Sequence, residues 1–343
     1  MIIRPASSAD GQEMLRLIEA HPARGNMSIL YTRRPDAYQS YQTECPGAKI
    51  VVCTDNSGGL LAQIACLPRK LYVNSEIHSV GYVTGLHKAD GAFINIIKML
   101  KDEHFRSSAE QFFCSILDDN ESVFNLFAKR GLFHAIYNYT TYLIHPAAVK
   151  HKRHKLQFRR ARSEDATRLL DFYNNEGKRY SYFPVFSTKD DFSGLNVLDF
   201  YLLEDGAELI AAGALWDQRP FKQYVVVDYK GMYRLAAHCN PMLRALHYPP
   251  LPDVNTAANF AQISFLICRD GDHFLEQIMF GELATAGRGF DFLTIGSAAQ
   301  DPFSNHLNSI RSLKFGSKIC VCDYAENSLA PAGIIPRFEC ALL

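Results

Sequence analysis

The chain has 343 residues, of which 48% are hydrophobic and 21% are charged. This composition excludes a wholly disordered protein, and the length predicts two domains of about 100–200 residues each. The 36 Lys and Arg residues balance the 36 Asp and Glu residues, so the formal net charge is zero. Proteins that coat nucleic acid are usually basic, and the charge therefore disfavours a nucleic-acid partner.

The cysteines and the apolar segments indicate the compartment. Nine cysteines are present without a C-x-x-C pair, which predicts free thiols in a reducing environment and no metal site. No stretch approaches about 18 consecutive apolar residues, and the N-terminal sequence lacks the basic and apolar regions of a secretion signal. We therefore expect a cytoplasmic protein with no membrane partner. The sequence does not predict the oligomeric state.

In chain order, the first half predicts one unit of strands and helices. A short strand and a Ser- and Asp-rich helix start open it at residues 3–10. Periodic apolar positions then predict strands over 48–54, 60–66 and 80–86, a helix over 92–102, a strand over 111–117, a helix over 121–129 and a strand over 135–144.

A basic segment, residues 145–157, separates this unit from the rest of the chain. Such a tract can contact nucleic acid or serve as a nuclear-localisation signal. Because it is short, lies at a boundary and belongs to a neutral chain, a solvated linker over 148–157 is the preferred interpretation.

The second half repeats the first. Arg4, Ala6, Ser8 and Asp10 recur as Arg159, Ala161, Ser163 and Asp165, at an offset of 155 residues. Later, an apolar run, an Asp-Gly pair and a helical stretch occur in both halves, with Gly91 and Gly271 180 residues apart. The growing offset places about 25 extra residues in the second half. We assign them to an insertion near 231–258, where prolines favour a surface loop after a helical segment.

The remaining elements complete two copies of one mixed unit. Strands near 200–204, 208–216 and 222–228 precede the insertion, and a strand over 261–268, a helix over 273–287, a strand over 291–296, a helix over 303–313 and a strand over 318–324 follow it. The expected fold class is mixed α/β (α+β), with domains 1–147 and 158–343. Each domain is expected to be a mostly antiparallel sheet flanked by helices.

The order of elements and one local motif resemble the GNAT acyltransferase superfamily. The segment Asn120-Glu-Ser-Val-Phe-Asn-Leu-Phe-Ala-Lys-Arg-Gly-Leu-Phe133 is similar to that family's signature of Asn, a small residue, Tyr, Lys, Gly and Phe, and an Arg4-Pro5-Ala6 start is also typical. The resemblance implies two tandem GNAT-like domains that take acetyl-CoA or another acyl-CoA as co-substrate. It also implies acyl transfer to an amine acceptor, either a small molecule or a peptide. A catalytically inactive tandem module that binds a ligand or a protein is the alternative.

The resemblance further implies that the segment 83–93 contacts the acyl-CoA. A glycine at the start of a helix lets backbone N–H groups approach a pyrophosphate, and Gly91 has this place, with Lys88 adding positive charge. Phe93 stands where the family has a small residue, so a tight strand-to-helix turn is the alternative. The candidate donor contacts are Val83, Leu86, Lys88, Gly91, Ala92, Phe93 and Asn120.

The equivalent candidates in the second copy are Cys268, Gly271 and His273. Asp270 and Asp272 flank this glycine and would repel an anion, so helix capping is the preferred interpretation of the second loop. We favour the first copy as the donor site, because its Asn and Gly signature is better preserved.

Catalytic candidates are few. The family's mechanism implies a base that takes the amine proton and a Tyr that protonates the departing thiolate. His87 is a weak candidate for the base, with an ordinary exposed or hydrogen-bonded histidine as the alternative. Phe127 stands where the Tyr is expected, so the first copy lacks this proton donor. Asp217 and Asp228 are acidic candidates in the second copy, with surface carboxylates as the alternative.

Overall fold

The computed structural model describes all residues except 24, 93–95, 129–132, 188–194 and 323–332. The strands of the first half are β1 (Ile2–Pro5), β2 (Met27–Thr32), β3 (Lys49–Thr54), β4 (Leu60–Val73), β5 (Glu76–Lys88), β6 (Gln111–Leu117) and β7 (Phe133–Ile144). Its α-helices are α1 (Gly11–Glu19), α2 (Ala37–Glu44), α3 (Ile96–Leu100), α4 (Glu103–Arg106) and α5 (Glu121–Ala128).

The second half follows a short 3-10 helix, η2 (Pro146–Ala148). Its strands are β8 (Gln157–Arg160), β9 (Phe183–Pro184), β10 (Phe200–Asp205), β11 (Glu208–Trp216), β12 (Gln223–Tyr229), β13 (Phe260–Cys268), β14 (Phe292–Ala298) and β15 (Ser312–Cys322). Its α-helices are α6 (Ala166–Gly177), α7 (Met232–His238), α8 (Asn240–Ala245), α9 (His273–Ala286) and α10 (Phe303–Asn308). A last 3-10 helix is η6 (Cys340–Leu342).

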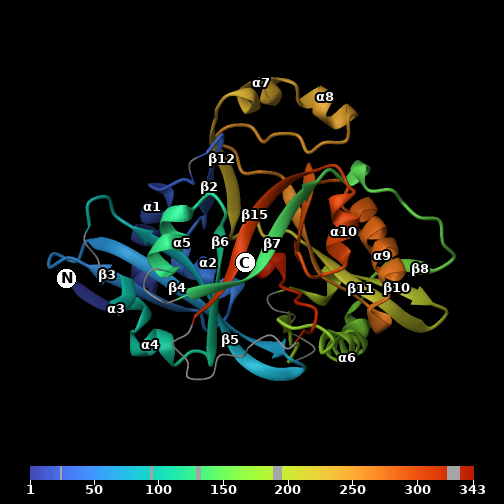
Figure 1. The fold of residues 1–343 in the computed structure, drawn as a ribbon, viewed down its shortest axis with the longest axis horizontal. Helices are drawn as coiled ribbons and strands as arrows, with labels where there is room; N and C mark the ends of the chain where they lie inside the picture. Colours follow the sequence, from blue (N-terminus) through green and yellow to red (C-terminus); the bar gives the residue numbers. More distant parts are fainter. Residues whose placement is uncertain (24, 93–95, 129–132, 188–194, 323–332) are drawn as a thin grey trace.

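In the described part of the chain, thirteen strands form one sheet that runs through both halves (Figure 1). Twelve of them lie in the order β1-β3-β4-β5-β6-β15-β7-β14-β13-β11-β10-β8, and β9 pairs with β4. Most neighbouring strands are antiparallel, whereas β5 is parallel to β6 and β13 is parallel to β14. The predicted mixed α/β class with a mostly antiparallel sheet is therefore confirmed.

The two halves exchange strands at the centre of this sheet. β15, from the second half, lies between β6 and β7 of the first half and pairs with both. β7 in turn pairs with β14 of the second half. The β7–β15 pair extends from Phe133 opposite Cys322 to Ile144 opposite Ser312. Each half thus completes the sheet of the other.

The residues that recur in both halves make the same ion pair. Arg4 donates to Asp10 at 2.9 and 2.7 Å, and Arg159 donates to Asp165 at 2.7 and 2.8 Å. Each carboxylate also accepts the main-chain N–H three residues before it. A bidentate Arg–carboxylate pair is among the strong hydrogen-bonded contacts of proteins. Here it connects the first strand of each half to the helical segment that follows.

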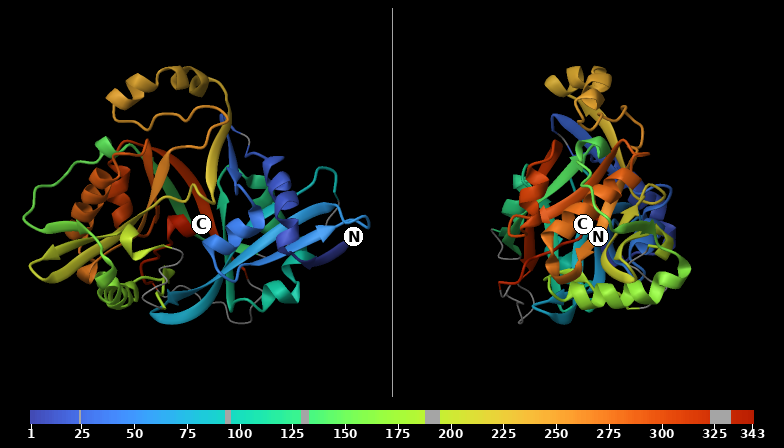
Figure 2. Two further views of the ribbon diagram at one scale, coloured as in Figure 1. Left: turned by 180° about the vertical axis from the view of Figure 1, so that it is seen from behind. Right: turned by 90° about the vertical axis from the view of Figure 1, so that its right-hand side faces the viewer.

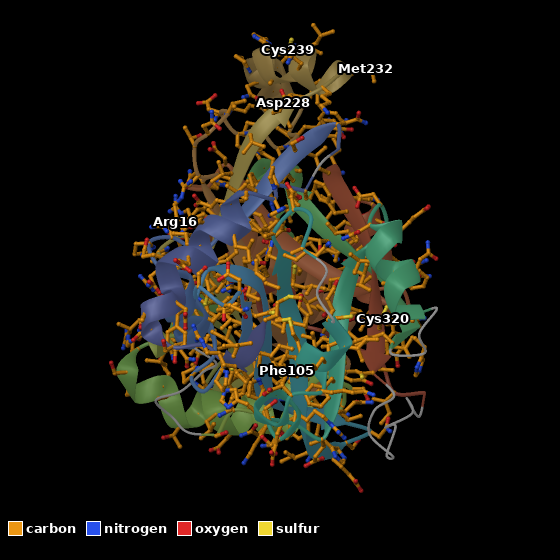
Figure 3. The ribbon with its side chains drawn as sticks, turned by 90° about the vertical axis from the view of Figure 1, so that its left-hand side faces the viewer. Arg16, Phe105, Asp228, Met232, Cys239 and Cys320 are labelled. Atoms are coloured by element: carbon orange, nitrogen blue, oxygen red, sulfur yellow. The ribbon has the colours of Figure 1, made fainter. Side chains whose placement is uncertain are left out.

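A second, two-stranded sheet joins the halves. β2 of the first half pairs with β12 of the second, from Met27 opposite Tyr229 to Thr32 opposite Gln223. The predicted insertion follows β12 and contains α7 and α8, which have no buried residues and project from the rest of the molecule (Figure 2). Met232 and Cys239 lie at this tip (Figure 3).

Two predicted helices have different bounds in the structure. Of the helix predicted over 92–102, the described residues form α3 at Ile96–Leu100. A separate turn, α4, follows because Asp102 accepts the N–H of His104 at 3.0 Å. The helix predicted over 303–313 is too long: α10 ends at Asn308, and Ser312 already pairs with β7.

Two further differences concern the segments around β2. The strand predicted over 222–228 exists as β12, but it pairs with β2 instead of joining the main sheet. The sequence analysis missed β2 and α2, although the side chain of Asp36 caps α2 by accepting the N–H of Gln39 at 2.8 Å.

The cysteines belong to the cores of the molecule. All nine are free thiols, as predicted, and all but Cys239 are buried. Five of the buried cysteines belong to strands β3, β4, β6 and β15 and share one hydrophobic core: Cys53, Cys66, Cys114, Cys320 and Cys322. In such surroundings a thiol acts as a small hydrophobic group.

Candidate functional site

Two parallel strands of the first half separate and open a cleft. β5 and β6 pair only from Val80 opposite Gln111 to Tyr82 opposite Phe113. Beyond this point β5 continues along β4 to Lys88, while β6 continues along β15 to Leu117. The ends of the two strands therefore diverge, and among the described residues no strand pairs with the main-chain edges that face each other there.

A β-bulge lies where β5 leaves β6. Gly85 and Leu86 stand opposite Ile64 alone, because the register of β4 and β5 shifts by one residue there. Gly85 has a φ of 63°, and a Cβ at this position would lie 1.9 Å from the hydroxyl of Tyr41. A side chain is thus excluded by both the conformation and the space. No hydrogen bond from a side chain to either bulge residue occurs in the described part of the chain.

The bulge faces a cavity of about 570 Å³. The ends of β5 and β6 form one wall, and β2, β12, β15 and the proline-containing segment 249–252 form the others. A volume of this size lies in the usual range for small-molecule sites, about 300–1,000 Å³. The cavity draws residues from both halves, so neither half alone provides a complete site.

A buried ion cluster lies at the cavity wall. Glu44 is fully buried and binds Arg33 at 2.7 Å and Lys222 at 3.2 Å. Burial opposes the charge of Glu44, but the nearby Lys222 and Arg33 outweigh it and lower its pKa to about 2. Within this cluster two cations face one carboxylate, and Lys222 also donates to the main-chain oxygen of Leu343 at 2.8 Å. The rest of the lining adds Lys314 and the carboxylates of Asp118 and Asp119, so the cavity has charges of both signs.

His87 lies on the same wall, next to the bulge. Burial, followed by the charges of His21 and Arg33, lowers the pKa of His87 to about 4. The imidazole is therefore neutral at pH 7 and can accept a hydrogen bond. It is a weak base, because an efficient catalytic base has a pKa near the working pH.

The second half contains the same cleft and the same bulge. β13 and β14 pair only from Phe260 opposite Phe292 to Gln262 opposite Thr294 and then separate. Phe265 and Leu266 stand opposite Gly213 alone, 180 residues after the first bulge. Phe265 has a φ of 54°, a strained conformation for a bulky residue.

The chain itself fills this second cleft. The N–H of Phe265 donates to Glu339 at 2.5 Å, and its carbonyl accepts the hydroxyl of Tyr173 at 2.9 Å. Arg337 donates to the carbonyl of Leu266 at 3.3 Å. Side chains of the protein therefore already occupy the N–H and carbonyl groups of the second bulge that could bind a ligand.

The charges of the second cleft are the reverse of those in the first. Arg337 binds Glu276 at 2.8 Å and Asp301 at 2.9 Å, and all three side chains are buried. Here one cation faces two anions. Burial raises the pKa of the third carboxyl, Glu339, to about 7.

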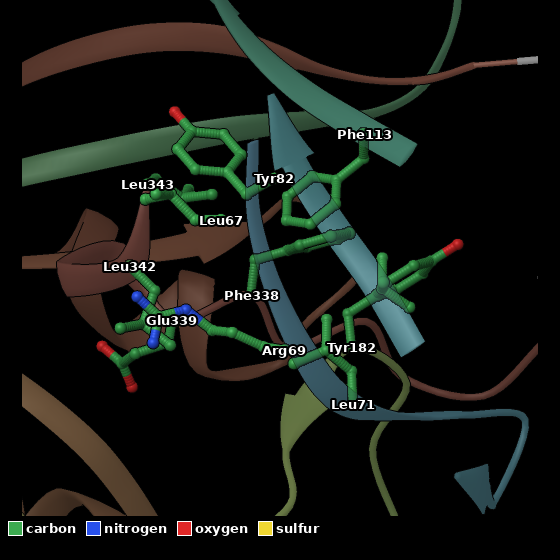
Figure 4. Close-up of a pocket in the computed structure, with 11 residues that line it drawn as sticks. Leu67, Arg69, Leu71, Tyr82, Phe113, Tyr182, Phe338, Glu339, Leu342 and Leu343 are labelled. Carbon is green, nitrogen blue, oxygen red and sulfur yellow. The ribbon is translucent and has the colours of Figure 1, made fainter. Parts of the chain in front are cut away.

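Aromatic rings anchor the C-terminal segment that carries these side chains. Phe338 lies among Phe113, Tyr82 and Tyr182, and its ring stacks on that of Tyr182 at 4.4 Å (Figure 4). The space left beside them is about 20 Å³, room for a single water molecule.

Comparison with solved structures finds the same arrangement in N-acyltransferases. The structure is similar to the glucosamine N-acetyltransferase region of a fungal multi-domain β-N-acetylglucosaminidase, with a TM-score of 0.62, 12% identity and coverage of 93% of this chain and 38% of that one. It is also similar to Saccharomyces cerevisiae N-myristoyltransferase with bound myristoyl-CoA, with a TM-score of 0.60, 9% identity and coverage of 98% and 85%. The chain has a tandem GNAT-like fold.

A third similar structure is a GCN5-related N-acetyltransferase from Anabaena variabilis, with a TM-score of 0.52, 10% identity and coverage of 93% of this chain and 72% of that one. No protein-family model matches the sequence, and no curated protein matches it either. The similarities to these three solved structures confirm the predicted tandem GNAT-like architecture at the level of the fold. No helix in the described residues is long and apolar enough to span a membrane.

The first GNAT copy brings one predicted donor contact, Leu86, and the candidate base, His87, to the cavity lining. Val83 is buried in the core on the other side, against Met99 and its neighbours. Lys88 is exposed and donates to the carbonyl of Ala92 at 3.3 Å.

Gly91, Ala92 and Asn120 lie outside the cavity lining. Gly91 has a φ of 74°, and open space surrounds the position of a Cβ. Asn120 is exposed just before α5. Phe93 lies outside the described residues, and so does the side chain of Phe127.

The second-copy candidates lie beside the filled cleft. Cys268 is buried at the end of β13, and Gly271 follows it in a turn with a φ of 65°. His273 begins α9 and contacts Glu276 at 3.1 Å. Asp272 caps α9 by accepting the N–H of Phe274 at 2.7 Å, in agreement with the capping interpretation.

The acidic candidates of the second copy pair with arginines. Asp217 binds Arg219 at 2.7 Å, and Asp228 lies 3.5 Å from Arg234. Neither carboxylate lines the cavity.

The sequence analysis missed the ion cluster of the cavity. Arg33 and Glu44 belong to the unpredicted β2–α2 segment, and Lys222 comes from the other half of the chain. The neighbours of these residues in the sequence, Thr32 and Arg34 or Gln42 and Thr43, do not distinguish them from ordinary surface charges.

Proposed function

We propose that the chain is an acyl-CoA-dependent N-acyltransferase whose donor site is the cleft of the first GNAT copy. The observation that carries the proposal is the open bulge at Gly85 and Leu86, which faces a cavity of about 570 Å³. The fold of N-acetyltransferases and N-myristoyltransferases supports it. The second copy is the degenerate one, because its own C-terminal segment fills the corresponding cleft.

The donor would lie between the diverging ends of β5 and β6. An extended pantetheine arm can bond to the exposed main chain of β5 as an additional strand would. Arg33 and Lys222 place two cationic groups at the cavity wall, where they can attract an anionic co-substrate. We retain Lys88 and Gly91 as the proposed pyrophosphate contact, since they follow directly on the same strand.

The acceptor would enter from the side of β2, β12 and segment 249–252. This wall contains Tyr31 and Tyr224, whose rings lie 4.3 Å apart. An aromatic and proline-rich wall suits the apolar part of an amine acceptor, either a small molecule or a peptide.

The proposed reaction is direct transfer. The amine nitrogen attacks the thioester carbonyl, the C–N bond forms and the C–S bond breaks. The proton that the amine loses passes through solvent to the departing sulfur, so CoA leaves as the thiol. Main-chain N–H groups at the bulge would stabilise the developing oxyanion. His87, neutral at pH 7, would accept a hydrogen bond from the attacking amine. Because its pKa is low, alignment of donor and acceptor would supply most of the rate.

Calorimetric titration of the full chain with acetyl-CoA and with longer acyl-CoAs tests the donor site. We expect one acyl-CoA per chain, and affinity at least about 10-fold lower for Gly91→Glu, because a carboxylate would repel the pyrophosphate. Gly271→Glu, at the equivalent position of the second copy, is the matched control and should bind as the wild type does. Failure of every acyl-CoA to bind would contradict the proposal.

Release of free CoA thiol in the presence of a panel of amines and N-terminal peptides tests the transfer step. Acylation of at least one acceptor is expected, with the product identified by mass spectrometry. Acyl-CoA binding without transfer to any amine would favour the alternative, a binding module without catalysis.

A further inference from the structure

The basic linker between the two GNAT copies is fixed to α9. The carbonyl oxygen of Lys150 lies 3.5 Å from the position that a Cβ of Gly281 would take, so the two main chains are close. Lys152 donates to the side chain of Gln277 at 2.5 Å and lies over the ring of Phe274 at 4.6 Å. The linker is therefore not simply solvated, contrary to the interpretation from its charge.

Two histidines of this linker meet one carboxylate of α9. The Nε2 atoms of His151 and His154 lie 2.5 and 2.9 Å from the same oxygen, Oε1 of Glu282. One potential ligand atom from each of the three residues lies within 4.8 Å of the others. Two imidazoles and a carboxylate are a common ligand set for Zn²⁺.

The surroundings leave this carboxylate without a permanent cation. In the described residues Glu282 pairs only with the two histidines, and the ammonium of Lys152 is held by Gln277. The side chain of His154 is nine-tenths buried, and its Nδ1 atom has no hydrogen-bond partner among the described residues.

We propose that His151, His154 and Glu282 bind a divalent transition-metal ion, with Zn²⁺ as the best fit. Each residue supplies one ligand atom, at the usual distance of about 2.0–2.2 Å from the ion. The three ligand atoms would move apart slightly to admit it. His151 is about half exposed, so water can take the remaining coordination position.

The ion would join the linker to the second GNAT copy. His151 and His154 belong to the linker that follows β7, whereas Glu282 belongs to α9 of the second copy. An ion held by both segments stabilises the folded chain, because the unfolded chain does not hold the three ligands together. This role is independent of acyl transfer.

Titration of the metal-free full chain with Zn²⁺ alone tests the site. We expect one ion per chain, and at a free Zn²⁺ concentration 100 times the dissociation constant the unfolding equilibrium should shift about 100-fold toward the folded state. Co²⁺ should give visible absorption bands without the thiolate charge-transfer band that a cysteine ligand would add.

Variants identify the ligands. Glu282→Gln and His154→Ala should each lower Zn²⁺ affinity by at least about 10-fold and abolish the Co²⁺ bands, while circular dichroism shows that they fold. His78→Ala, which removes another histidine paired with a carboxylate at 2.9 Å, is the matched control and should bind as the wild type does. Cys239→Ser removes the exposed thiol and should also leave binding unchanged. Wild type that binds no Zn²⁺, or a His151→Ala/His154→Ala double variant that binds it normally, would overturn the proposal.

Discussion

The two bulges of the molecule have similar backbone conformations, but different side chains surround them. At the first, Gly85 has a positive φ and faces an open cavity. At the second, Phe265 has a similar φ, and Glu339, Arg337 and Tyr173 saturate the bulge with hydrogen bonds. The backbone of the cleft is therefore repeated, whereas its availability to a ligand is set by side chains from elsewhere in the chain.

The buried ion clusters of the two clefts also differ in their ratio of cations to anions. The first cleft pairs Glu44 with two cations, and the second pairs Arg337 with two carboxylates. The two carboxylates of the second arrangement would repel a CoA pyrophosphate, whereas the first arrangement places two cations at the cavity wall. The comparison shows how one of two similar copies can lose a ligand site and become a support for the other.

The largest effect is expected from removal of the cation in the second cleft. Arg337→Ala leaves Glu276 and Asp301 buried without their partner, which should lower the free energy of unfolding by about 3–5 kcal/mol. Urea denaturation measures it. Arg179→Ala removes a more exposed pair with Asp270 and should cost less than about 1 kcal/mol. If the second cleft only supports the fold, the acyl-CoA affinity of folded Arg337→Ala stays unchanged.

A substitution at the first bulge should affect both stability and binding. Gly85→Ala places a methyl group 1.9 Å from the hydroxyl of the buried Tyr41, and we expect a loss of about 2–4 kcal/mol together with weaker acyl-CoA binding. Gly206→Ala is the control, because its φ is 60° but no atom lies within 4 Å of the added carbon. Equal losses in the two variants would contradict the close packing of the bulge against Tyr41.

The pH dependence of stability should have opposite signs in the two clefts. The pKa of Glu339 is raised to about 7 by burial, so the folded chain binds a proton more tightly than the unfolded chain. Stability from this group is present below about pH 4.5 and is lost as the pH rises through 7. Glu339→Gln still accepts the N–H of Phe265 and should be more stable than the wild type at pH 8, by at most about 3 kcal/mol, and similar to it near pH 4.5.

The first cleft should show the reverse. The pKa of His87 is lowered to about 4, mainly by burial, so its stabilising contribution is present above pH 6.5 and is lost as the pH falls through 4. Compared with His87→Gln, the wild type should lose up to about 3 kcal/mol between pH 7 and pH 4. Unfolding curves recorded at several pH values for both proteins give the difference. A difference independent of pH would mean that His87 titrates normally.

The sequence predicts the repeated parts of this molecule and not the parts that distinguish the copies. Apolar runs and the Arg4 and Asp10 repeat indicate two units, because these signals depend on residues that lie close together in the sequence. The exchange of β7 and β15 does not follow from such patterns, since both strands would fit either half. The Arg33, Glu44 and Lys222 cluster depends on the β2–β12 pairing across the halves, which no periodicity reveals.

The smallest effect concerns the start of α5, where the two copies again diverge. The N–H of Asn120 donates to Leu117 at 2.9 Å, and the N–H of Asp301, three residues after β14, donates to Ala298 at 3.0 Å. The carboxylate of Asp301 forms an ion pair with Arg337, whereas Asn120 is exposed beside the open cleft.

Asn120→Ala should raise the acyl-CoA dissociation constant about 3- to 10-fold, which corresponds to roughly 1 kcal/mol. It should also lower the free energy of unfolding by about 1 kcal/mol if Asn120 caps α5. Asn120→Ser separates the two roles, because serine is also a good cap but cannot reach as far toward a ligand. Calorimetric binding and urea denaturation of both variants decide between them: if Ser restores stability and affinity together, Asn120 acts only as a cap. If Ser restores stability alone, Asn120 contacts the donor, and the carboxylate of Asp301 explains why the second copy could not keep that contact.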